Sequence, residues 1–147
     1  MYKRIVVAID GSSTSKRALH EATKLAREWR SVLRIVHVID FFNFNVETPT
    51  GLAEYEASVR RSGEQILQHA AAIARKTGVE YEAKLLVVQR VRDRIAEVVA
   101  REAKGWRAEL IVIGTHGRRG ASRLFLGSVS ESILRIAPAP VLLIRGK

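Results

Sequence analysis

Five short apolar runs alternate with amphipathic helical patterns along this chain, and this alternation constrains the fold more than any other feature. The first, fourth and fifth runs are almost continuously apolar, which is typical of parallel strands buried on both faces. The third run alternates more, which suits a position nearer the edge of a sheet. The runs lie at Ile5–Ile9, Val32–Val38, Tyr81–Val88, Leu110–Ile113 and Val141–Ile144.

Helical patterns fill the intervals between these runs. The first begins after Ser12 or Ser13, either of which can cap the helix. The other three cover about 55–78, 91–105 and 129–136, with apolar residues three and four apart. Strict alternation of strand and helix predicts an α/β fold with a parallel sheet and right-handed crossovers.

The composition predicts one globular domain over residues 1–147. Hydrophobic residues make up 47% and charged residues 27%, enough apolar material for one core. The only long irregular stretch, 41–51, is interpreted as a surface loop. There is no cysteine, so thiolate metal sites are excluded. The apolar run at Ile5–Ile9 is too short for a signal sequence or a membrane span, and we expect a cytoplasmic protein.

The net charge of +10 favours polyanionic partners. The basic residues are nevertheless spread along the chain, and no helix-turn-helix, RNP or zinc-finger pattern is present. Nucleic-acid binding is therefore kept only as an alternative function.

Two loops that follow strand runs carry unusual residues. The first run leads into Asp10-Gly11-Ser12, and the fourth leads into a glycine-rich stretch that ends at Gly127-Ser128. Ligands of open α/β sheets bind beyond the carboxyl ends of the strands, where the strand order reverses. If the first and fourth strands are neighbours, both loops converge on one crevice.

The glycine-rich loop has the ingredients of a phosphate cradle. Backbone can approach a ligand closely at its glycines, because no Cβ intervenes. Ser128 begins the last helix, so the amides of Val129 and Ser130 would point at an anion, and the helix dipole would add to the attraction. The glycines concerned are Gly114, Gly117 and Gly127.

A simpler interpretation is a turn followed by a helix cap. Ser128 and Glu131 have the spacing of a capping box. Capping explains Ser128 but leaves the upstream glycines and arginines without a role. Arg118 is assigned to phosphate neutralisation, because guanidinium groups suit phosphate geometry. Arg119 and Arg123 fit solvated loop charges equally well.

The pattern Gly114-x2-Gly117-x9-Gly127-Ser128 resembles the nucleotide-binding signature of the universal stress proteins, in the subgroup that binds ATP. The opening Ile5–Ser12 resembles the first strand and loop of that family. The end, from Gly127 to Arg145, resembles its last helix and strand. The resemblance covers essentially the whole chain.

The resemblance implies an open, Rossmann-like five-stranded parallel sheet of order 3-2-1-4-5 with helices on both faces. It also implies a homodimer paired through the C-terminal strand, and ATP or a related adenine nucleotide as ligand. A divalent ion, Mg²⁺ or Mn²⁺, would accompany the phosphates. The family often has Gly and Pro after the third strand, where this chain has 88–92 as Val-Gln-Arg-Val-Arg, so selectivity for the base is less constrained than phosphate binding.

Roles for individual residues follow from the same resemblance. Asp10 would bind the ribose, the backbone of Val38 would meet the adenine edge, and Ile113 would pack on the base or sugar. Gly114 would give the sugar room. The phosphates would be held by residues of the glycine-rich loop and the helix after it, namely Gly117, Gly127, Ser128, Val129 and Ser130.

We therefore expect a stress-response or signalling module that holds a nucleotide and hydrolyses it slowly or not at all. A slow ATPase or phosphoryl-transfer enzyme is the alternative. Against it, the chain lacks a G-x-x-x-x-G-K-[ST] loop, a lysine placed for terminal phosphates, and a nucleophile with a paired base. No catalytic residue and no protein metal ligand are assigned.

Overall fold

The computed structural model describes residues 1–42, 51–116 and 126–146, which includes only the ends of the expected surface loop at 41–51. In this part of the chain, strands and helices alternate as the sequence predicts. The elements are β1 (Arg4–Ala8), α1 (Ser13–Trp29), β2 (Val32–Ile39), α2 (Leu52–Thr77), β3 (Tyr81–Val87), α3 (Ile95–Gly105), β4 (Leu110–Gly114), α4 (Ser128–Ile136) and β5 (Val141–Ile144).

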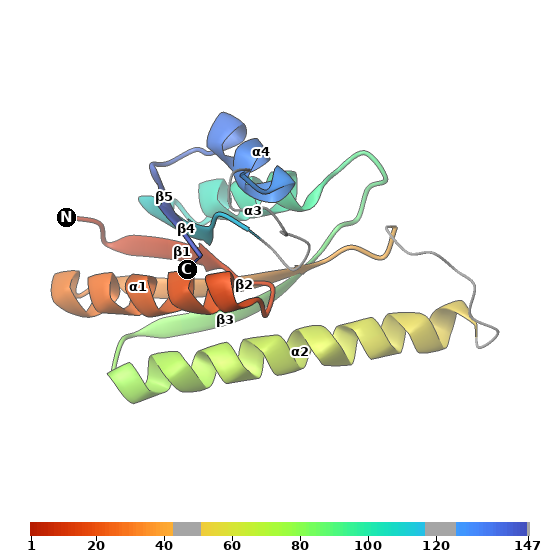
Figure 1. Ribbon diagram of the computed structural model, residues 1–147, viewed down its shortest axis with the longest axis horizontal. Coiled ribbons are helices and arrows are strands. Elements are labelled where there is room, and N and C mark those ends of the chain that lie inside the picture. Colours follow the sequence, from red (N-terminus) through yellow and green to blue (C-terminus); the bar gives the residue numbers. More distant parts are fainter. Residues whose placement is uncertain (43–50, 117–125, 147) are drawn as a thin grey trace.

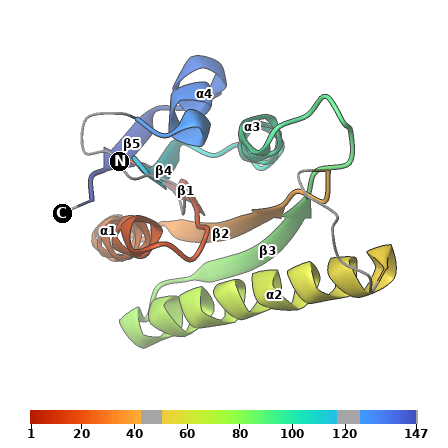
Figure 2. The same ribbon diagram turned by 45° about the vertical axis from the view of Figure 1, so that its right-hand side comes forward.

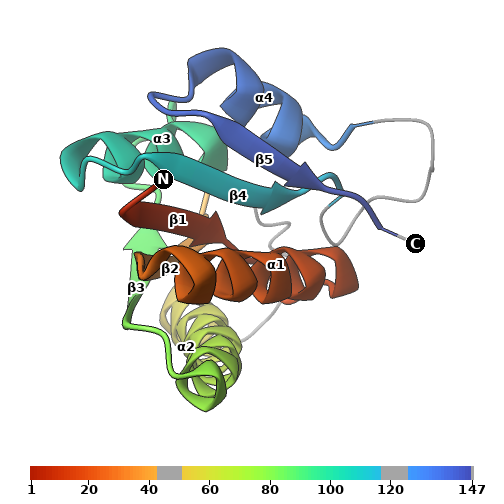
Figure 3. The same cartoon turned by 90° about the vertical axis from the view of Figure 1, so that its left-hand side faces the viewer.

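The strands form one parallel sheet with the order β3-β2-β1-β4-β5, which confirms the expected topology. Helices α1 and α2 cover one face, and α3 and α4 cover the other (Figure 1; Figure 2). Figure 3 shows β5 lying beside β4 at one edge of the sheet. The opposite edge is β3, as its more alternating sequence predicted.

Two of the three continuously apolar runs, β1 and β4, lie inside the sheet, whereas the third forms the edge strand β5, so its predicted burial on both faces was wrong. Side chains of β1 alternate between the two faces: Ile5 and Val7 pack under α1 and α2, whereas Val6 packs under α3 and α4. All three are 0% exposed. Because both faces are covered by helices, both sets of side chains must be apolar. β5 differs, since each of its four residues is only half-buried.

Two helix starts show how capping decides a boundary. Ser12 caps α1 and accepts a hydrogen bond from the amide of Ser15 at 3.1 Å. α3 begins at Ile95, later than the Val91 that its periodicity indicated, so that prediction was wrong. The cap is Arg94, whose amide donates to the Glu97 carboxylate at 2.9 Å. Val91 lies outside the helix and is 78% exposed.

Helix α2 is buried against the sheet only from Gly63 onward. It is 26 residues long, and its buried residues all lie from Gly63 onward. Leu67 is the large apolar residue among them, 8% exposed, whereas Leu52 at the first turn is 55% exposed. No helix in the described parts of the chain is long and apolar enough to cross a membrane.

Because α2 is buried unevenly along its length, a leucine-to-alanine substitution should lower the free energy of unfolding by different amounts at different positions of the helix. Leu67→Ala should lower the free energy of unfolding by about 2–3 kcal/mol, because it leaves a cavity under the helix. Leu52→Ala should cost less than about 0.5 kcal/mol, because its side chain is already in water. Urea unfolding followed by circular dichroism measures both; equal losses would contradict the described packing.

Candidate functional site

The central strand β1 ends earlier than the strands on either side of it. Its last pair with β2 is Ala8–Val36, and its last pair with β4 is Val7–Val112. β2 and β4 both continue, to Ile39 and Gly114. The turn from β1 into α1 therefore lies between the ends of two longer strands. Because β1 and β4 are neighbours, the two loops singled out in the sequence start side by side at this end of the sheet.

The β1–α1 turn holds Asp10 in a fixed place. Its Oδ1 accepts a hydrogen bond from the Ser12 amide at 2.8 Å, and its own amide donates to Ser15 Oγ at 3.3 Å. Gly11 supports this turn with a φ of +82°, which favours glycine. Oδ2 has no hydrogen bond from the residues described, so this oxygen of a half-buried carboxylate can accept one from a ligand.

Gly114, at the end of β4, is packed directly against α1. A Cβ on Gly114 would lie 2.7 Å from Thr14 Cγ2 and 3.2 Å from the Thr14 carbonyl carbon, far inside van der Waals contact. From the sequence we expected the lack of a side chain at Gly114 to leave room for a sugar. The structure shows that Thr14 already needs this space. Thr14 had no distinguishing signal in the sequence, because the contact depends on how α1 crosses β4.

The residues after Gly114 join β4 to two other elements. The Thr115 amide donates to the Ile144 carbonyl at 2.9 Å, and the Thr115 carbonyl accepts from the Gly127 amide at 2.7 Å. Thr115 Oγ1 lies 2.9 Å from His116 Nδ1. His116 Nε2 is buried and has no hydrogen-bond partner among the described residues. A buried ring nitrogen in this position is suited to a polar ligand.

The first turn of α4 is capped by glycine, not by serine. Gly127 is the N-cap and no side chain caps the helix, so the predicted capping box of Ser128 and Glu131 was wrong. Glu131 pairs instead with Arg135, at 2.8 Å. The amides of the first turn are consequently left without a side-chain acceptor, in a position where the helix dipole attracts an anion.

Ser128 and Val129 are exposed in this turn, but Ser130 is not. Ser130 is 4% exposed, and its hydroxyl donates to the Gly114 carbonyl at 2.7 Å. Its side chain therefore holds α4 against β4. Because the hydroxyl is used in this bond, only the backbone amide of Ser130 can make the predicted contact with phosphate. The same bond holds the start of α4 beside the end of β4.

The two residues expected at the base have buried side chains. Val38 is 9% and Ile113 4% exposed, and both pack in the core under α3 and α4. Val38 lies two residues beyond Val36, the last residue of β2 that pairs with β1. Its backbone therefore lies beyond the paired part of β1, and the contact expected between this backbone and adenine stays a prediction.

Part of the predicted site cannot be placed. Gly117 and Arg118, together with Arg119 and Arg123, lie outside the described residues. Within the described ranges, no group of three His, Asp or Glu side chains is arranged to hold a metal ion.

Comparison with known proteins gives one consistent family. Residues 1–145 match the universal stress protein family. A universal stress protein of Thermus aquaticus is 36% identical over 147 residues, covering 99% of this chain and 100% of that one. A solved structure from this family, from Burkholderia pseudomallei, is 34% identical with a TM-score of 0.77, covering 97% of this chain and 96% of that chain.

The solved relatives include complexes with nucleotides. A universal stress protein from Archaeoglobus fulgidus, in complex with dAMP, is 28% identical to this chain with a TM-score of 0.71. The similarity covers 97% of this chain and 98% of that one.

The contact between Gly114 and Thr14 predicts a coupled pair of substitutions. Gly114→Ala should lower the free energy of unfolding by about 1–3 kcal/mol, because the new methyl group overlaps Thr14. Thr14→Ser removes Cγ2 and should recover part of that loss in the double variant. Urea unfolding of the two single variants and the double variant measures the coupling; strictly additive losses would show that the two residues are not in contact.

Proposed function

The chain belongs to the universal stress protein family, and we propose that it binds ATP or a related adenine nucleotide at the carboxyl ends of β1 and β4. The observation that carries this proposal is the first turn of α4, capped by Gly127 without a side-chain acceptor. Ser130 holds that turn beside β4 through its bond to Gly114. A helix start of this kind binds phosphate through backbone amides and the helix dipole.

Two further groups suit the rest of a nucleotide. Asp10 Oδ2 is available to accept hydrogen bonds from ribose hydroxyls, while Oδ1 keeps the carboxylate oriented. His116 Nε2 is a buried polar atom that lacks a protein partner in the described part of the chain. The dAMP complex of the Archaeoglobus relative supports an adenine nucleotide as the ligand class.

The proposal gives each part of the nucleotide its own residues. Asp10 binds the ribose, and the Val38 backbone meets the adenine. Gly127, Ser128 and Val129 hold the phosphates, with the amide of Ser130, and with Gly117 and Arg118 from the segment that is not described. Mg²⁺ or Mn²⁺ would sit on the phosphates and supply charge neutralisation there.

The biological role we propose is that of a cytoplasmic stress-response module whose nucleotide sets its conformation or its choice of partner. Hydrolysis is slow or absent in this proposal, because the chain has no P-loop lysine to reach terminal phosphates. A slow ATPase is the second candidate, favoured by His116 Nε2, which has no hydrogen-bond partner among the residues that the structure describes. Sustained phosphate release over many turnovers would select it.

Blocking the start of α4 should remove nucleotide binding. Gly127 has φ −63° and ψ 153°, a backbone conformation that valine adopts without strain. Gly127→Val should therefore leave the fold intact while its side chain occupies the space beside the first-turn amides. We expect the affinity for ATP with magnesium to fall by at least about 100-fold, or about 2.8 kcal/mol, measured by calorimetry.

Gly105→Val is the control for this substitution. Gly105 lies at the end of α3, and no atom lies within 4 Å of a Cβ built there. This variant should bind ATP like the parent protein. Unchanged ATP binding by a folded Gly127→Val would show that the phosphates lie elsewhere, and absence of binding by the parent protein at millimolar ATP would refute the proposed function.

We propose in addition that the protein is a homodimer joined through β5. The four residues of this edge strand are all apolar and half-buried. Leu134 and Ile136 on the neighbouring helix α4 are 46% and 43% exposed. An apolar strand edge is prone to pair with another chain unless it is covered, and pairing with a second copy would cover it.

The direction of backbone groups in β5 gives a selective test. The carbonyl of Pro140 accepts from Ile111 of β4, and that of Ile144 accepts from Thr115 just after β4, so the backbone groups of Leu143 point to the open edge. Leu143→Pro removes an N–H that β4 does not use, and should convert a dimer into a monomer in light scattering after gel filtration. Leu143→Ala keeps the N–H and should remain dimeric. A dimer that survives Leu143→Pro would place the interface elsewhere.

A further inference from the structure

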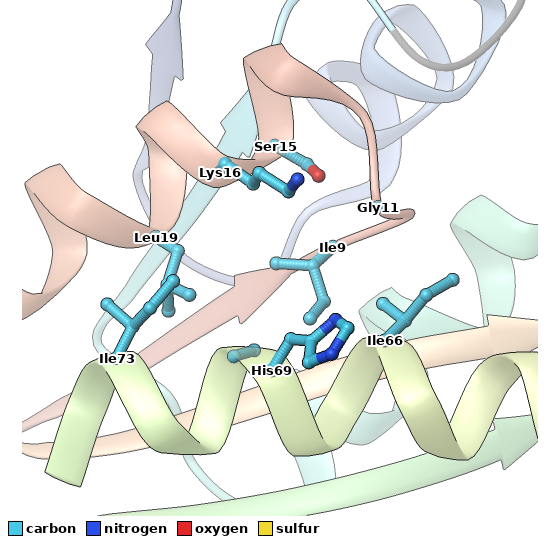
Figure 4. A pocket seen from close by; sticks show the side chains of 9 residues that line it. Ile9, Gly11, Ser15, Lys16, Leu19, Ile66, His69 and Ile73 are labelled. Carbon is cyan, nitrogen blue, oxygen red and sulfur yellow. The ribbon is translucent and has the colours of Figure 1, made fainter.

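A small cavity lies between α1 and α2, on the face of the sheet opposite to α3 and α4. Its volume is about 120 Å³. Ile9, just beyond the end of β1, contributes to the lining, with Leu19 from α1 and with Ile66 and Ile73 from α2 (Figure 4). These side chains are all aliphatic, so the cavity excludes a ligand that is polar throughout.

Three polar side chains line the cavity: Ser15, whose hydroxyl already donates to the Ser12 carbonyl, Lys16 and His69. Figure 4 shows the ring of His69 on α2 facing α1, and the side chain of Lys16 lying along α1 beside Ser15. Neither Lys16 nor His69 has a side-chain hydrogen bond or an ion pair with any described residue. No carboxylate lines the cavity, so the charge of Lys16 is not neutralised there.

The size of the cavity limits the ligand. An engineered cavity of about 150 Å³ holds a benzene molecule, so 120 Å³ accommodates a chain of about four to six carbon atoms. An aliphatic chain of this length would pack on Leu19, Ile66 and Ile73, and a carboxylate at its end would reach the Lys16 ammonium. Charge-assisted hydrogen bonds of this kind are among the stronger polar contacts in proteins.

We propose that the cavity between α1 and α2 binds a short-chain aliphatic monocarboxylate, with the chain between the two helices and the carboxylate on Lys16 and His69. Two features of the structure define this ligand: an aliphatic lining without acids, and a lysine with no partner at the opening. The cavity shares Gly11 and Ser15 with the turn that carries Asp10. Its aliphatic lining lies between α1 and α2, away from α4, so the proposal does not rest on nucleotide binding.

Hexanoate is the probe that tests this site. Titration of the nucleotide-free protein, followed by amide chemical shifts, should move resonances of Gly11, Ser15 and Ala70, which line the cavity. Affinity should rise about three- to fourfold for each methylene group from butyrate to hexanoate, because each adds buried apolar surface. Hexanol, which lacks the charge, should bind at least about tenfold more weakly than hexanoate.

Two variants of α1 separate the specific contact from the effect of overall charge. Lys16→Met should weaken hexanoate binding at least about tenfold and leave hexanol binding nearly unchanged. Lys24→Met removes the same charge from the same helix, at a residue paired with Glu21 at 2.7 Å, and should bind hexanoate like the parent protein. Both positions are exposed, so both variants should fold.

Three results would overturn the proposal. The first is the absence of saturable shifts at the cavity with hexanoate up to tens of millimolar. The second is an equal loss of affinity in the Lys16 and Lys24 variants, which would indicate attraction to the basic surface alone. The third is equal binding of hexanol and hexanoate, which would indicate an apolar groove without recognition of the carboxylate.

Discussion

The junction at Gly114 and Thr115 is the contact on which the candidate site depends. At this point the end of β4 meets α1 through Thr14, α4 through Ser130 and Gly127, and β5 through Ile144. Three of these contacts are hydrogen bonds of 2.7–2.9 Å, and the fourth is a packing contact that only a glycine allows. The first turn of α4 and the turn that carries Asp10 are thereby held on the same end of the sheet.

The architecture was predictable because it depends on periodicity. Continuous apolar runs indicated that β1 and β4 are buried on both faces, and Val6 and Ile111 are indeed fully buried. The alternating pattern of Tyr81–Val88 indicated an edge strand, and β3 is at the edge. The order of the strands came from the resemblance to the universal stress proteins. The spacing of apolar residues predicted the start of α3 wrongly, because this spacing does not show which residue caps the helix, here Arg94.

The site was less predictable, since it depends on contacts between residues far apart in the sequence. The serine-glutamate spacing at Ser128 indicated a capping box, but the chain enters α4 with Gly127 at the cap, so Ser128 is already inside the helix. The amide of Ser130 was predicted to face phosphate, and the sequence did not indicate that the hydroxyl of the same residue bonds to the Gly114 carbonyl. These outcomes are set by the angle at which α4 meets β4, for which the sequence carries no local signal. The glycines and Asp10 could be singled out from the sequence because such residues are unusual at strand ends, and their contacts with a nucleotide stay a prediction.

The central position of β1 has a consequence for the growing chain on the ribosome. β1 is synthesised first and can pair with β2 soon afterwards, but its other neighbour, β4, begins at Leu110. At 5–20 residues per second, β2 and β4 are separated by roughly 4–15 s of synthesis. During that interval one edge of the central strand, with its three fully buried residues Ile5, Val6 and Val7, stays without its partner. The nascent chain thus exposes, for seconds, a surface that the finished protein buries completely, and this is the period in which protection by a chaperone would matter most.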